Sequence, residues 1–574
     1  MPSLAEVRAQ LTGPGGMFEV VTEDVAGRPL QVYAQRMRSL REIAQGAAAR
    51  GDDTFLAYGD REYGFDDFVA EANGMGHLLA TEYGIGPGDR VAVLSQNNPE
   101  WCLAFWATVA QGAILVGLNG WWKADEVLYG LQDSGATVLF ADRKRFERIA
   151  DRLDEAPELA HVFLIDATPD DFPDTPGSAT LHSVDVLTGA PRDEFPDTAI
   201  DEDDAAVIFY TSGTTGKPKG AISTHRSMIA NLQNTIYSTV SSTMANPSGG
   251  SALGGGPTVS LLTSPLFHVS GCHSGLVVGL LAGIKIVIPE GRFDPVHVLR
   301  LIQDHQVTVW ATVPTMVWRV CEHPGRHDYD TSSVTTVAFG GSPSADELQR
   351  KIADTFPQVR STSNAYGLTE TSSVATVISG DDAKRKPWSV GPPVPTVEVR
   401  IVNAAGEPLG EGETGEVCIR GPILMKGYWN KPEATAEAID PDGWLHTGDI
   451  GHLDEDGYLA ITDRKKDMII RGGENIYCVE IENRLVLNPA VADAAVIGVA
   501  HPELGEEVKA VVQVEPGHEL SEDDVRRWVA AELADFKVPA YVEVQSDPLP
   551  RNASGKLLKN VLRGEGEVSF AETM

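Results

Sequence analysis

The chain has 574 residues, of which 42% are hydrophobic, an ordinary share for a globular protein. This length is too great for a single hydrophobic core, so we expect two to four structural units. The formal net charge is −36, from 46 basic and 82 acidic residues. A surface with that excess of carboxylates repels phosphate backbones, which argues against a nucleic-acid partner.

Cysteine usage and the apolar runs indicate the compartment. The five cysteines form no Cys-x-x-Cys pair, which argues against a disulfide framework or zinc site and favours a reducing compartment. The first residues lack the basic and apolar blocks of a signal peptide. The longest apolar run, 276–288, is shorter than a membrane span and contains Lys285. We therefore expect a cytoplasmic protein with no integral membrane segment; its oligomeric state stays open, with a homodimer as one alternative.

The first part of the chain reads as alternating helices and buried strands. Residues 90–95 and 136–141 are β-rich runs separated by segments of helical spacing, which is typical of a parallel α/β layer. This pattern predicts one α/β subdomain over 1–204. A second α/β subdomain is expected over 205–391, with strands near 284–288, 307–312 and 335–339.

The remaining chain predicts two smaller units. Residues 397–401 and 416–420 alternate between apolar and polar positions and are separated by glycine-rich turns, which favours a small antiparallel β-barrel over 392–462. After Asp463 we expect a compact α+β unit with strands near 494–498 and 509–514 and a helix capped by Ser521. The predicted fold class is therefore α/β with a smaller C-terminal α+β domain.

Residues 238–257 are rich in Ser, Gly and Ala and have no periodicity. This composition favours a solvated loop, with a mobile cover over the active site as the alternative.

The segment 210–220, Tyr-Thr-Ser-Gly-Thr-Thr-Gly-Lys-Pro-Lys-Gly, follows an apolar strand-like run. Its glycines allow backbone N–H groups to face an anion, its hydroxyls add donors, and Lys217 and Lys219 add positive charge. It is not a Walker A loop, because Thr211 stands where that motif has glycine and Pro218 stands where it has Ser or Thr. We interpret it as a phosphate-binding loop.

Four more motifs follow in a fixed order along the chain. They are Asn-Ala-Tyr-Gly-Leu-Thr-Glu-Thr (364–371), Gly-Trp-Leu-His-Thr-Gly-Asp-Ile-Gly (443–451), Asp-Arg-Lys-Lys-Asp-Met-Ile-Ile-Arg-Gly-Gly-Glu-Asn (463–475) and Pro-Arg-Asn-Ala-Ser-Gly-Lys (550–556). Together with the loop, they resemble the signatures of the adenylate-forming superfamily, which includes acyl-CoA synthetases, carrier-protein adenylation domains and beetle luciferases. The resemblance extends over essentially the whole chain.

This resemblance implies a fold and a reaction. Members have a large N-terminal domain and a mobile C-terminal domain with the active site between them, here 1–462 and 467–574 with a hinge at 463–466. They activate a carboxylate with ATP to an acyl-adenylate and pyrophosphate, and a thiol then displaces AMP. Because the first step joins two anions, catalysis requires positioning and charge neutralisation. The implied cofactors and co-substrates are ATP, Mg²⁺ and coenzyme A.

The resemblance also implies roles for individual residues. The 211–219 loop would hold the β- and γ-phosphates, Tyr366 would lie along the adenine, and Thr369 would reach the α-phosphate. Glu370 would bind Mg²⁺, a cation that prefers oxygen ligands. The full set of expected nucleotide-binding residues is Thr211, Ser212, Gly213, Thr214, Thr215, Gly216, Lys217, Lys219, Gly341, Ser342, Pro343, Asn364, Tyr366, Gly367, Thr369, Asp449, Arg464 and Lys556.

Three residues near the C-terminus have implied roles in the domain rotation. Lys556 corresponds to the catalytic lysine that bridges the substrate carboxylate and the α-phosphate. Lys466 falls at the hinge position, where its backbone would absorb the rotation that follows adenylation. Gly473 would then lie beside the pantetheine channel, where the absence of a side chain lets the thiol arm pass.

The acid is expected to be apolar. Residues 265–271, Pro-Leu-Phe-His-Val-Ser-Gly, match a motif whose aromatic residue and histidine, here Phe267 and His268, line the acyl pocket. Amino-acid-activating members carry Asp at the position of His268, which argues against an amino-acid substrate. Cys272 stands where some long-chain members have a Trp gate, so a gated tunnel is not expected. His268 as an ordinary buried histidine is the alternative interpretation.

The predicted function is therefore an acyl-CoA synthetase for a fatty or related acid. An aromatic or alicyclic, steroid-type acid is the alternative substrate, and a carrier protein is the alternative acceptor. From a different class, the chain could be a non-catalytic nucleotide-binding protein; the joint retention of Glu370, Asp449, Arg464 and Lys556 argues against that.

Overall fold

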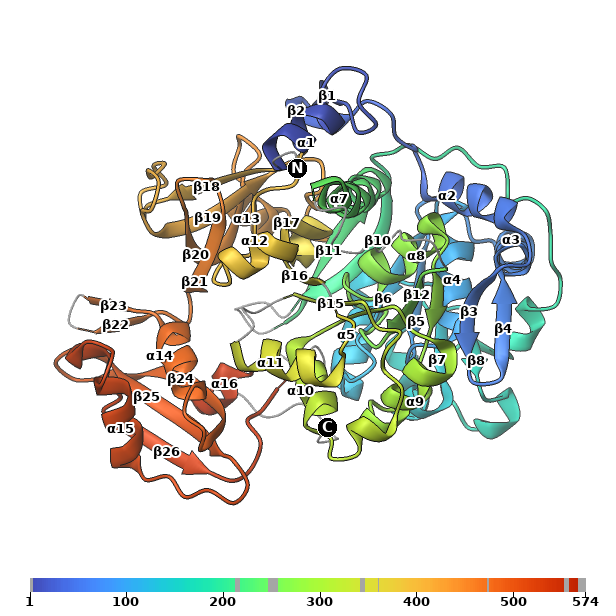
Figure 1. Ribbon diagram of the computed structural model, residues 1–574. Helices are drawn as coiled ribbons and strands as arrows, with labels where there is room; N and C mark the ends of the chain where they lie inside the picture. The colour runs from blue at the N-terminus through green and yellow to red at the C-terminus, as the bar shows by residue number, and fades with distance from the viewer. Residues whose placement is uncertain are drawn as a thin grey trace.

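The computed structural model describes residues 4–211, 217–245, 257–340, 346–359, 361–471, 474–551 and 557–565. The chain forms two large α/β layers, a small antiparallel sheet and a C-terminal α+β domain. Figure 1 shows the C-terminal domain, coloured orange to red, beside the rest of the chain and joined to it through β21. The α/β class and the separate C-terminal domain expected from the sequence are confirmed.

The first sheet has seven strands in the order β11-β10-β6-β5-β7-β8-β9. Its strands pair in parallel except for β10 with β11. They are β5 (Arg90–Leu94), β6 (Ile114–Gly117), β7 (Val138–Asp142), β8 (His161–Ile165), β9 (Thr180–Ser183), β10 (Ala205–Thr211) and β11 (Lys219–Thr224).

The second sheet has eight strands in the order β17-β16-β15-β14-β12-β13-β3-β4. Antiparallel strands β17 and β4 lie at its edges, and the strands between them pair in parallel. They are β3 (Thr54–Tyr58), β4 (Arg61–Gly64), β12 (Val259–Leu262), β13 (Lys285–Val287), β14 (Val309–Thr312), β15 (Thr336–Gly340), β16 (Ser361–Leu368) and β17 (Ser373–Ser379).

The two sheets exchange strands across the expected subdomain boundary at residue 204. Strands β3 and β4 come from the first subdomain but join the second sheet, while β10 and β11 come from the second but join the first. The boundary between 1–204 and 205–391 therefore does not separate two sheets, which corrects that prediction. The β3–β13 pairing joins Leu56 to Ile286, 230 residues apart, and the β6–β10 pairing joins Leu115 to Val207, 92 residues apart. Such pairings leave no trace in local periodicity.

Helices cover both sheets and fill the space between them. The largest buried side chains between the sheets include Trp101, Phe105 and Trp106 on α4, whose first turn is capped by the Asn98 side chain and begins with Pro99. The helices of this region are α2 (Leu40–Ala47), α3 (Phe65–Thr81), α4 (Pro99–Val109), α5 (Ala124–Ser134), α6 (Arg143–Phe146), α7 (His225–Ala245), α8 (Val278–Ala282), α9 (Pro295–His305), α10 (Pro314–Glu322), α11 (Asp346–Thr355), α12 (Gly380–Arg385) and α13 (Pro432–Ala438).

The solvated loop expected over 238–257 is partly wrong. Helix α7 continues to Ala245, so 238–245 are helical, and 246–256 lie outside the described residues. The hydroxyl of Ser238 donates to the Asn234 carbonyl (2.8 Å) and that of Thr239 to the Thr235 carbonyl (3.2 Å). These bonds satisfy the hydroxyl hydrogens along the helix, so a serine- and threonine-rich segment stays helical.

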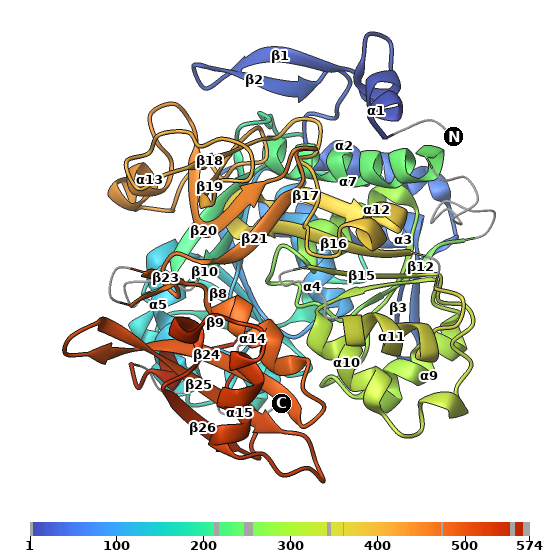
Figure 2. The same cartoon turned by 60° about the vertical axis from the view of Figure 1, so that its left-hand side comes forward.

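The small third sheet has four antiparallel strands, β18 (Glu398–Val402), β19 (Gly415–Arg420), β20 (Leu445–Leu453) and β21 (Leu459–Arg464). It occupies the region expected to form a β-barrel, and its last strand runs two residues past the expected boundary at 462. Figure 2 shows this sheet above the C-terminal domain, to which β21 leads.

The C-terminal domain is a five-stranded sheet with three helices, and Ser521 caps α15 as expected. At the other end of the chain, α1 packs against α7 and is followed by a β-hairpin (Figure 2). Among the described helices, none is both long and apolar enough to cross a bilayer. The remaining elements are β22 (Ile469–Arg471), β23 (Glu474–Ile476), β24 (Val491–His501), β25 (Gly505–Val514), β26 (Tyr541–Gln545), α14 (Cys478–Val486), α15 (Glu522–Ala530), α16 (Lys559–Leu562), α1 (Leu4–Thr12), β1 (Val20–Val25) and β2 (Arg28–Tyr33).

Candidate active site

A cleft of about 2490 Å³ lies between the second sheet, the third sheet and the C-terminal domain. The motifs that were widely separated in the sequence meet at its walls. The expected site residues that line it are Thr211, Lys217, Lys219, His268, Tyr366, Gly367, Thr369, Glu370, Asp449, Arg464 and Lys466.

Some expected site residues lie outside the described residues, so the structure does not place them. They are Ser212, Gly213, Thr214, Thr215, Gly216, Gly341, Ser342, Pro343, Gly473 and Lys556.

A buried hydrogen-bond network centres on Asp449. Strands β20 and β21 pair with Asp449 opposite Arg464, whose Nε lies 3.0 Å from Asp449 Oδ1. The Tyr366 hydroxyl donates to Asp449 Oδ2 at 2.7 Å. Burial, followed by the Asp449 charge, raises the pKa of Tyr366 well above its usual range, so the phenol stays a donor. The three side chains form one fixed unit at the cleft wall.

Glu370 follows β16 and faces the cleft. Its Oε1 accepts a hydrogen bond from the Tyr428 hydroxyl at 2.8 Å, which orients the carboxylate. Burial, followed by this carboxylate, raises the pKa of Tyr428. Tyr428 could not be recognised as a site residue from the sequence, because an aromatic residue after a glycine turn is too common to point to a site.

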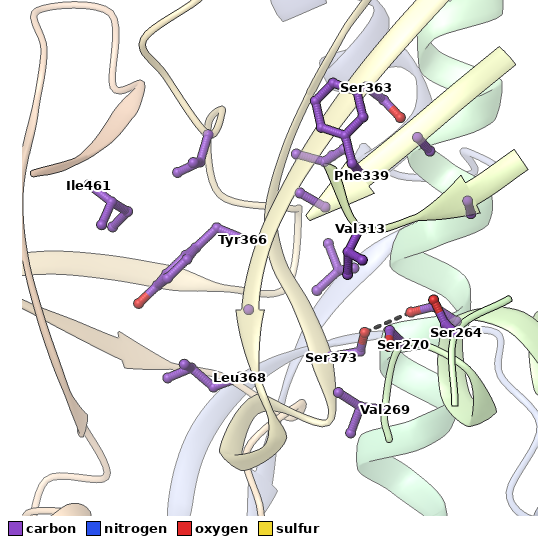
Figure 3. Close-up of a pocket in the computed structure, with 18 of the residues that line it drawn as sticks. Ser264, Val269, Ser270, Val313, Phe339, Ser363, Tyr366, Leu368, Ser373 and Ile461 are labelled. Atoms are coloured by element: carbon purple, nitrogen blue, oxygen red, sulfur yellow. Dashed lines mark hydrogen bonds between the residues drawn. The ribbon is translucent and has the colours of Figure 1, made fainter. Parts of the chain in front are cut away.

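The backbone after Glu370 is strained. Ser372 and Ser373 have φ values of 50° and 116°, a region that non-glycine residues rarely adopt. The Ser372 hydroxyl donates to Ser227 Oγ at 2.9 Å, and Ser373 Oγ lies 2.6 Å from Ser274 Oγ (Figure 3). A Cβ at Gly367 would lie 1.6 Å from the Ser373 carbonyl oxygen, so the close approach of β16 to this turn requires glycine. These contacts hold Thr369 and Glu370 at the mouth of the cleft.

The two lysines of the phosphate loop lie over aromatic rings. Lys217 Nζ is 4.8 Å from the Tyr129 ring centroid, and Lys219 Nζ is 5.1 Å from the Tyr428 ring centroid. Cation–π contacts of this kind hold an ammonium group without neutralising it. Neither lysine forms an ion pair with a described residue, so both charges remain available to an anion in the cleft.

Strand β16 separates two parts of the cleft. Figure 3 shows Tyr366 on the side of Ile461, whereas Ser264, Val269 and Ser373 lie together on the other side. The network around Asp449 therefore faces one compartment, and the residues near His268 face another. This division matches a site that holds a nucleotide and a second substrate on either side of one strand.

His268 lines the second compartment. Its ring borders the cleft on one side and is otherwise surrounded by protein atoms. This burial removes water from the imidazole and lowers the pKa of His268 to about 4. The imidazole is therefore neutral at physiological pH. It can hydrogen-bond a substrate or shape the cavity, but it does not supply a positive charge.

Three other expected site residues are not among the described cleft walls. Phe267 and Cys272 do not line it among the described residues; both side chains are buried, and Cys272 belongs to the core between the sheets. Asn364 is also buried and is absent from the described cleft walls. Cys272 begins a π-helical turn, Cys272–Val277, which changes the helical period and turns Ser274, rather than Cys272, towards the cleft.

The chain on both sides of Lys556 is fixed by ion pairs. Before it, Arg551 lies 2.6 Å from Asp493. After it, Lys559 lies 2.8 Å from Glu482 and Arg563 lies 3.1 Å from Asp467. Lys466 itself is exposed next to the cleft, one residue before Asp467.

Comparisons with known proteins agree with this arrangement. Residues 43–429 match the model of the AMP-binding enzyme family, and 480–556 match the AMP-binding enzyme C-terminal domain. A feruloyl-CoA synthase of Amycolatopsis sp is 36% identical over 92% of this chain and 97% of its own length. A 3-((3aS,4S,7aS)-7a-methyl-1,5-dioxo-octahydro-1H-inden-4-yl)propanoyl:CoA ligase of Rhodococcus jostii is 34% identical over 94% of this chain and 99% of its own length. The ATP-bound structure of MatB from Rhodopseudomonas palustris superposes with a TM-score of 0.78 at 30% identity, covering 92% of this chain and 99% of MatB.

Proposed function

Because the chain belongs to the family of AMP-binding enzymes and is an AMP-forming acid–CoA ligase, we propose that it activates an apolar carboxylic acid through an acyl-adenylate. The observation that carries this proposal is the Tyr366–Asp449–Arg464 network on one side of β16, with a second compartment on the other.

The reaction has two balanced steps. In the first, a carboxylate oxygen of the acid attacks the α-phosphorus of ATP, the bond to the β-phosphate breaks, and pyrophosphate leaves. In the second, the CoA thiol loses its proton and its sulfur attacks the acyl carbon. The acyl–oxygen bond breaks, and AMP leaves.

The nucleotide would be held by residues from several elements. Asp449 accepts from ribose hydroxyls while Arg464 donates to them, and the Tyr366 ring lies along the adenine. Lys217 and Lys219 neutralise the departing phosphates, and Thr369 reaches the α-phosphate. Each group acts by position and charge, as phosphoryl chemistry requires.

Mg²⁺ would be held by Glu370. The oriented carboxylate fits a hard cation that takes most of its ligands from water and phosphate oxygens. No cluster of three or more acidic, His or Cys side chains that could hold a metal occurs in the described part of the chain, so the nucleotide would have to supply the other ligands. When bound, Mg²⁺ neutralises phosphate charge and favours pyrophosphate as the leaving group.

Three further roles belong to this proposal. Lys556 would bridge the carboxylate and the α-phosphate in the first step. The domain rotation at Lys466 would then move Lys556 away from the substrates. It would bring Gly473 beside the pantetheine channel for the second step. The chain would thus divide into 1–462 and 467–574 around a hinge at 463–466.

The acid would be uncharged apart from its carboxylate. His268, neutral and next to the cleft, stands where amino-acid-activating members carry Asp, so an ammonium group would find no partner there. A fatty acid, an aromatic acid and an alicyclic acid all meet this condition, and a carrier protein is the alternative acceptor.

The test measures pyrophosphate and AMP release for a panel of fatty, aromatic, alicyclic and amino acids, with and without CoA. Release of both products with an apolar acid, and thioester formation only when CoA is present, is the expected result. If amino acids drive ATP–pyrophosphate exchange and no apolar acid does, the proposal is wrong.

Lys556→Ala and Lys466→Pro separate the two steps. Losing one preorganised charge typically costs about a hundredfold or more in rate, so Lys556→Ala should abolish adenylation yet still convert preformed acyl-AMP to thioester. Equal loss of both steps in Lys556→Ala would contradict the assignment of this lysine to adenylation.

A further inference from the structure

The two faces of the central strands of the second sheet differ in the size and burial of their side chains. On the face covered by α9, α10 and α11, Trp310 and Val337 are fully buried. On the opposite face, Ala311 is exposed and Ala338 is half-buried, although strands β14 and β15 are paired on both sides. A central strand normally covers such positions with large side chains. Here the second face forms the floor of the cleft.

The small side chains of this floor are aligned in register. Ala311 pairs with Ala338, Ala338 with Ser363, and Ser363 with Ser379. One row of two alanines and two serines therefore crosses four neighbouring strands, from β14 to β17. Since adjacent strands lie about 4.8 Å apart, the row is about 14 Å wide. We call these four residues the floor row.

Short hydroxyl side chains of α7 lie beside the floor row. Thr235, Thr239 and Ser242 line the cleft at positions i, i+4 and i+7 of α7, and therefore share one face of that helix. Ser379 Oγ donates to Ser242 Oγ at 3.3 Å, which joins α7 to the end of the floor row. The larger Leu262, opposite Ala311 on β12, bounds the other end. Hydroxyls therefore lie along one side of the floor row, and the larger Val313 and Phe339 line the cleft beyond it.

We infer that the acid taken by this enzyme is a broad, rigid ring system, a fused-ring alicyclic carboxylic acid, rather than an unbranched chain. An unbranched chain is only about 4 Å thick and could cover the floor row only by lying along it, which would leave uncovered the cleft-lining residues further along the same strands, Thr336, Ala365 and Gly367. A fused-ring skeleton covers the floor and loses little conformational entropy on binding, because its ring bonds are already fixed. The inference rests on the proposed acid–CoA ligase function and specifies its substrate.

The experiment compares kcat/KM for thioester formation with four acids: a decalin carboxylic acid, a tetracyclic bile acid, dodecanoic acid and ferulic acid. The fused-ring acids should exceed the other two by at least tenfold. A higher value for dodecanoic or ferulic acid overturns the inference but leaves the proposed function intact. No thioester from any of the acids, with ATP turnover on none, counts against the proposed function itself.

Substitutions in the floor row test whether this row determines the kcat/KM for fused-ring acids. Ala311→Leu fills the floor row at its most exposed position and should lower kcat/KM for the fused-ring acids by about 10- to 200-fold, the range for small steric changes in an apolar pocket. The values for dodecanoic acid and the KM for ATP should change less than threefold. Ala338→Leu tests the same row at its centre, and dodecanoic acid turnover reports whether either variant folds.

Ala282→Leu is the matched control. Ala282 lines the cleft at the end of α8 but is not part of the floor row, and the substitution adds the same volume. The ratio of fused-ring to dodecanoic kcat/KM should stay within threefold of the unchanged enzyme. If Ala311→Leu alters this ratio no more than Ala282→Leu does, the floor row does not hold the ring system and the inference is wrong.

Discussion

Removal of one hydroxyl tests the network around Asp449. Tyr366→Phe keeps the aromatic ring but deletes the donor that lies 2.7 Å from Asp449 Oδ2. A hydrogen bond to a charged group contributes about 1.5–3 kcal/mol, which corresponds to about a 10- to 150-fold change in an equilibrium constant. Arg464 remains 3.0 Å from the other carboxylate oxygen, so Asp449 keeps one partner and the effect should stay within this range.

The assay is ATP–pyrophosphate exchange with an acid that the enzyme accepts. If Asp449 contacts the ribose only when Tyr366 orients it, the KM for ATP should rise by that factor, and the KM for the acid should be unchanged. The proposed compartment for the acid lies on the other side of β16, which is why the two constants should separate.

Tyr33→Phe is the control. The Tyr33 hydroxyl is as deeply buried and donates to Asn234 Oδ1 at 2.6 Å, but Tyr33 is not among the described residues of the cleft wall. This variant should lower the melting temperature without changing the KM for ATP. The reasoning is refuted if Tyr366→Phe leaves the KM for ATP unchanged, or if it raises the constants for ATP and the acid equally.

Three other substitutions have defined outcomes. Glu370→Gln should raise the Mg²⁺ concentration needed for half-maximal exchange at least tenfold, and an unchanged requirement would exclude Glu370 as a ligand. Lys466→Pro restricts φ where no described backbone hydrogen bond is lost; adenylation should continue while thioester formation slows, and a loss of adenylation alone would contradict the hinge. Burial raises the pKa of Asp463 to about 6, so this carboxyl binds its proton more tightly in the folded chain and stability should fall as pH rises from about 4 to 6. Asp463→Asn should flatten that part of the pH profile of the melting temperature, and an unaltered profile would show that another group titrates.

Many of the strands, and the grouping of Tyr366, Asp449 and Arg464 at one wall of the cleft, could be predicted from the sequence. The run 90–95 contains β5 (Arg90–Leu94), because a buried parallel strand is a continuous apolar segment. The run 509–514 lies within β25, whose apolar centre was also recognisable from the sequence. The residues near Tyr366, Asp449 and Arg464 meet as the motifs implied. Sequence motifs can reveal such a group of residues, because side chains that bind one ligand must keep their identities and their spacing.

The acyl compartment could not be predicted in the same way. The position of Cys272 in its motif predicted that this side chain would line the acyl pocket. A π-helical turn, which the motif does not reveal, decides which side chains of that segment face the cleft. The floor row depends on the register of four strands that lie up to 68 residues apart in sequence, from Ala311 to Ser379. A single alanine or serine in a strand carries no signal until its neighbours across the sheet are known.

The ion pairs around Lys556 explain how one lysine can serve a single step. Arg551, Lys559 and Arg563 pair with Asp493, Glu482 and Asp467 respectively. All six residues lie after Lys466, so a rotation at the proposed hinge would leave these three ion pairs intact. The chain flanking Lys556 would then move with the C-terminal domain as one body, and in the proposed mechanism the hinge alone would bring Lys556 to the nucleotide or remove it. Removing the lysine and stiffening the hinge should therefore impair different steps.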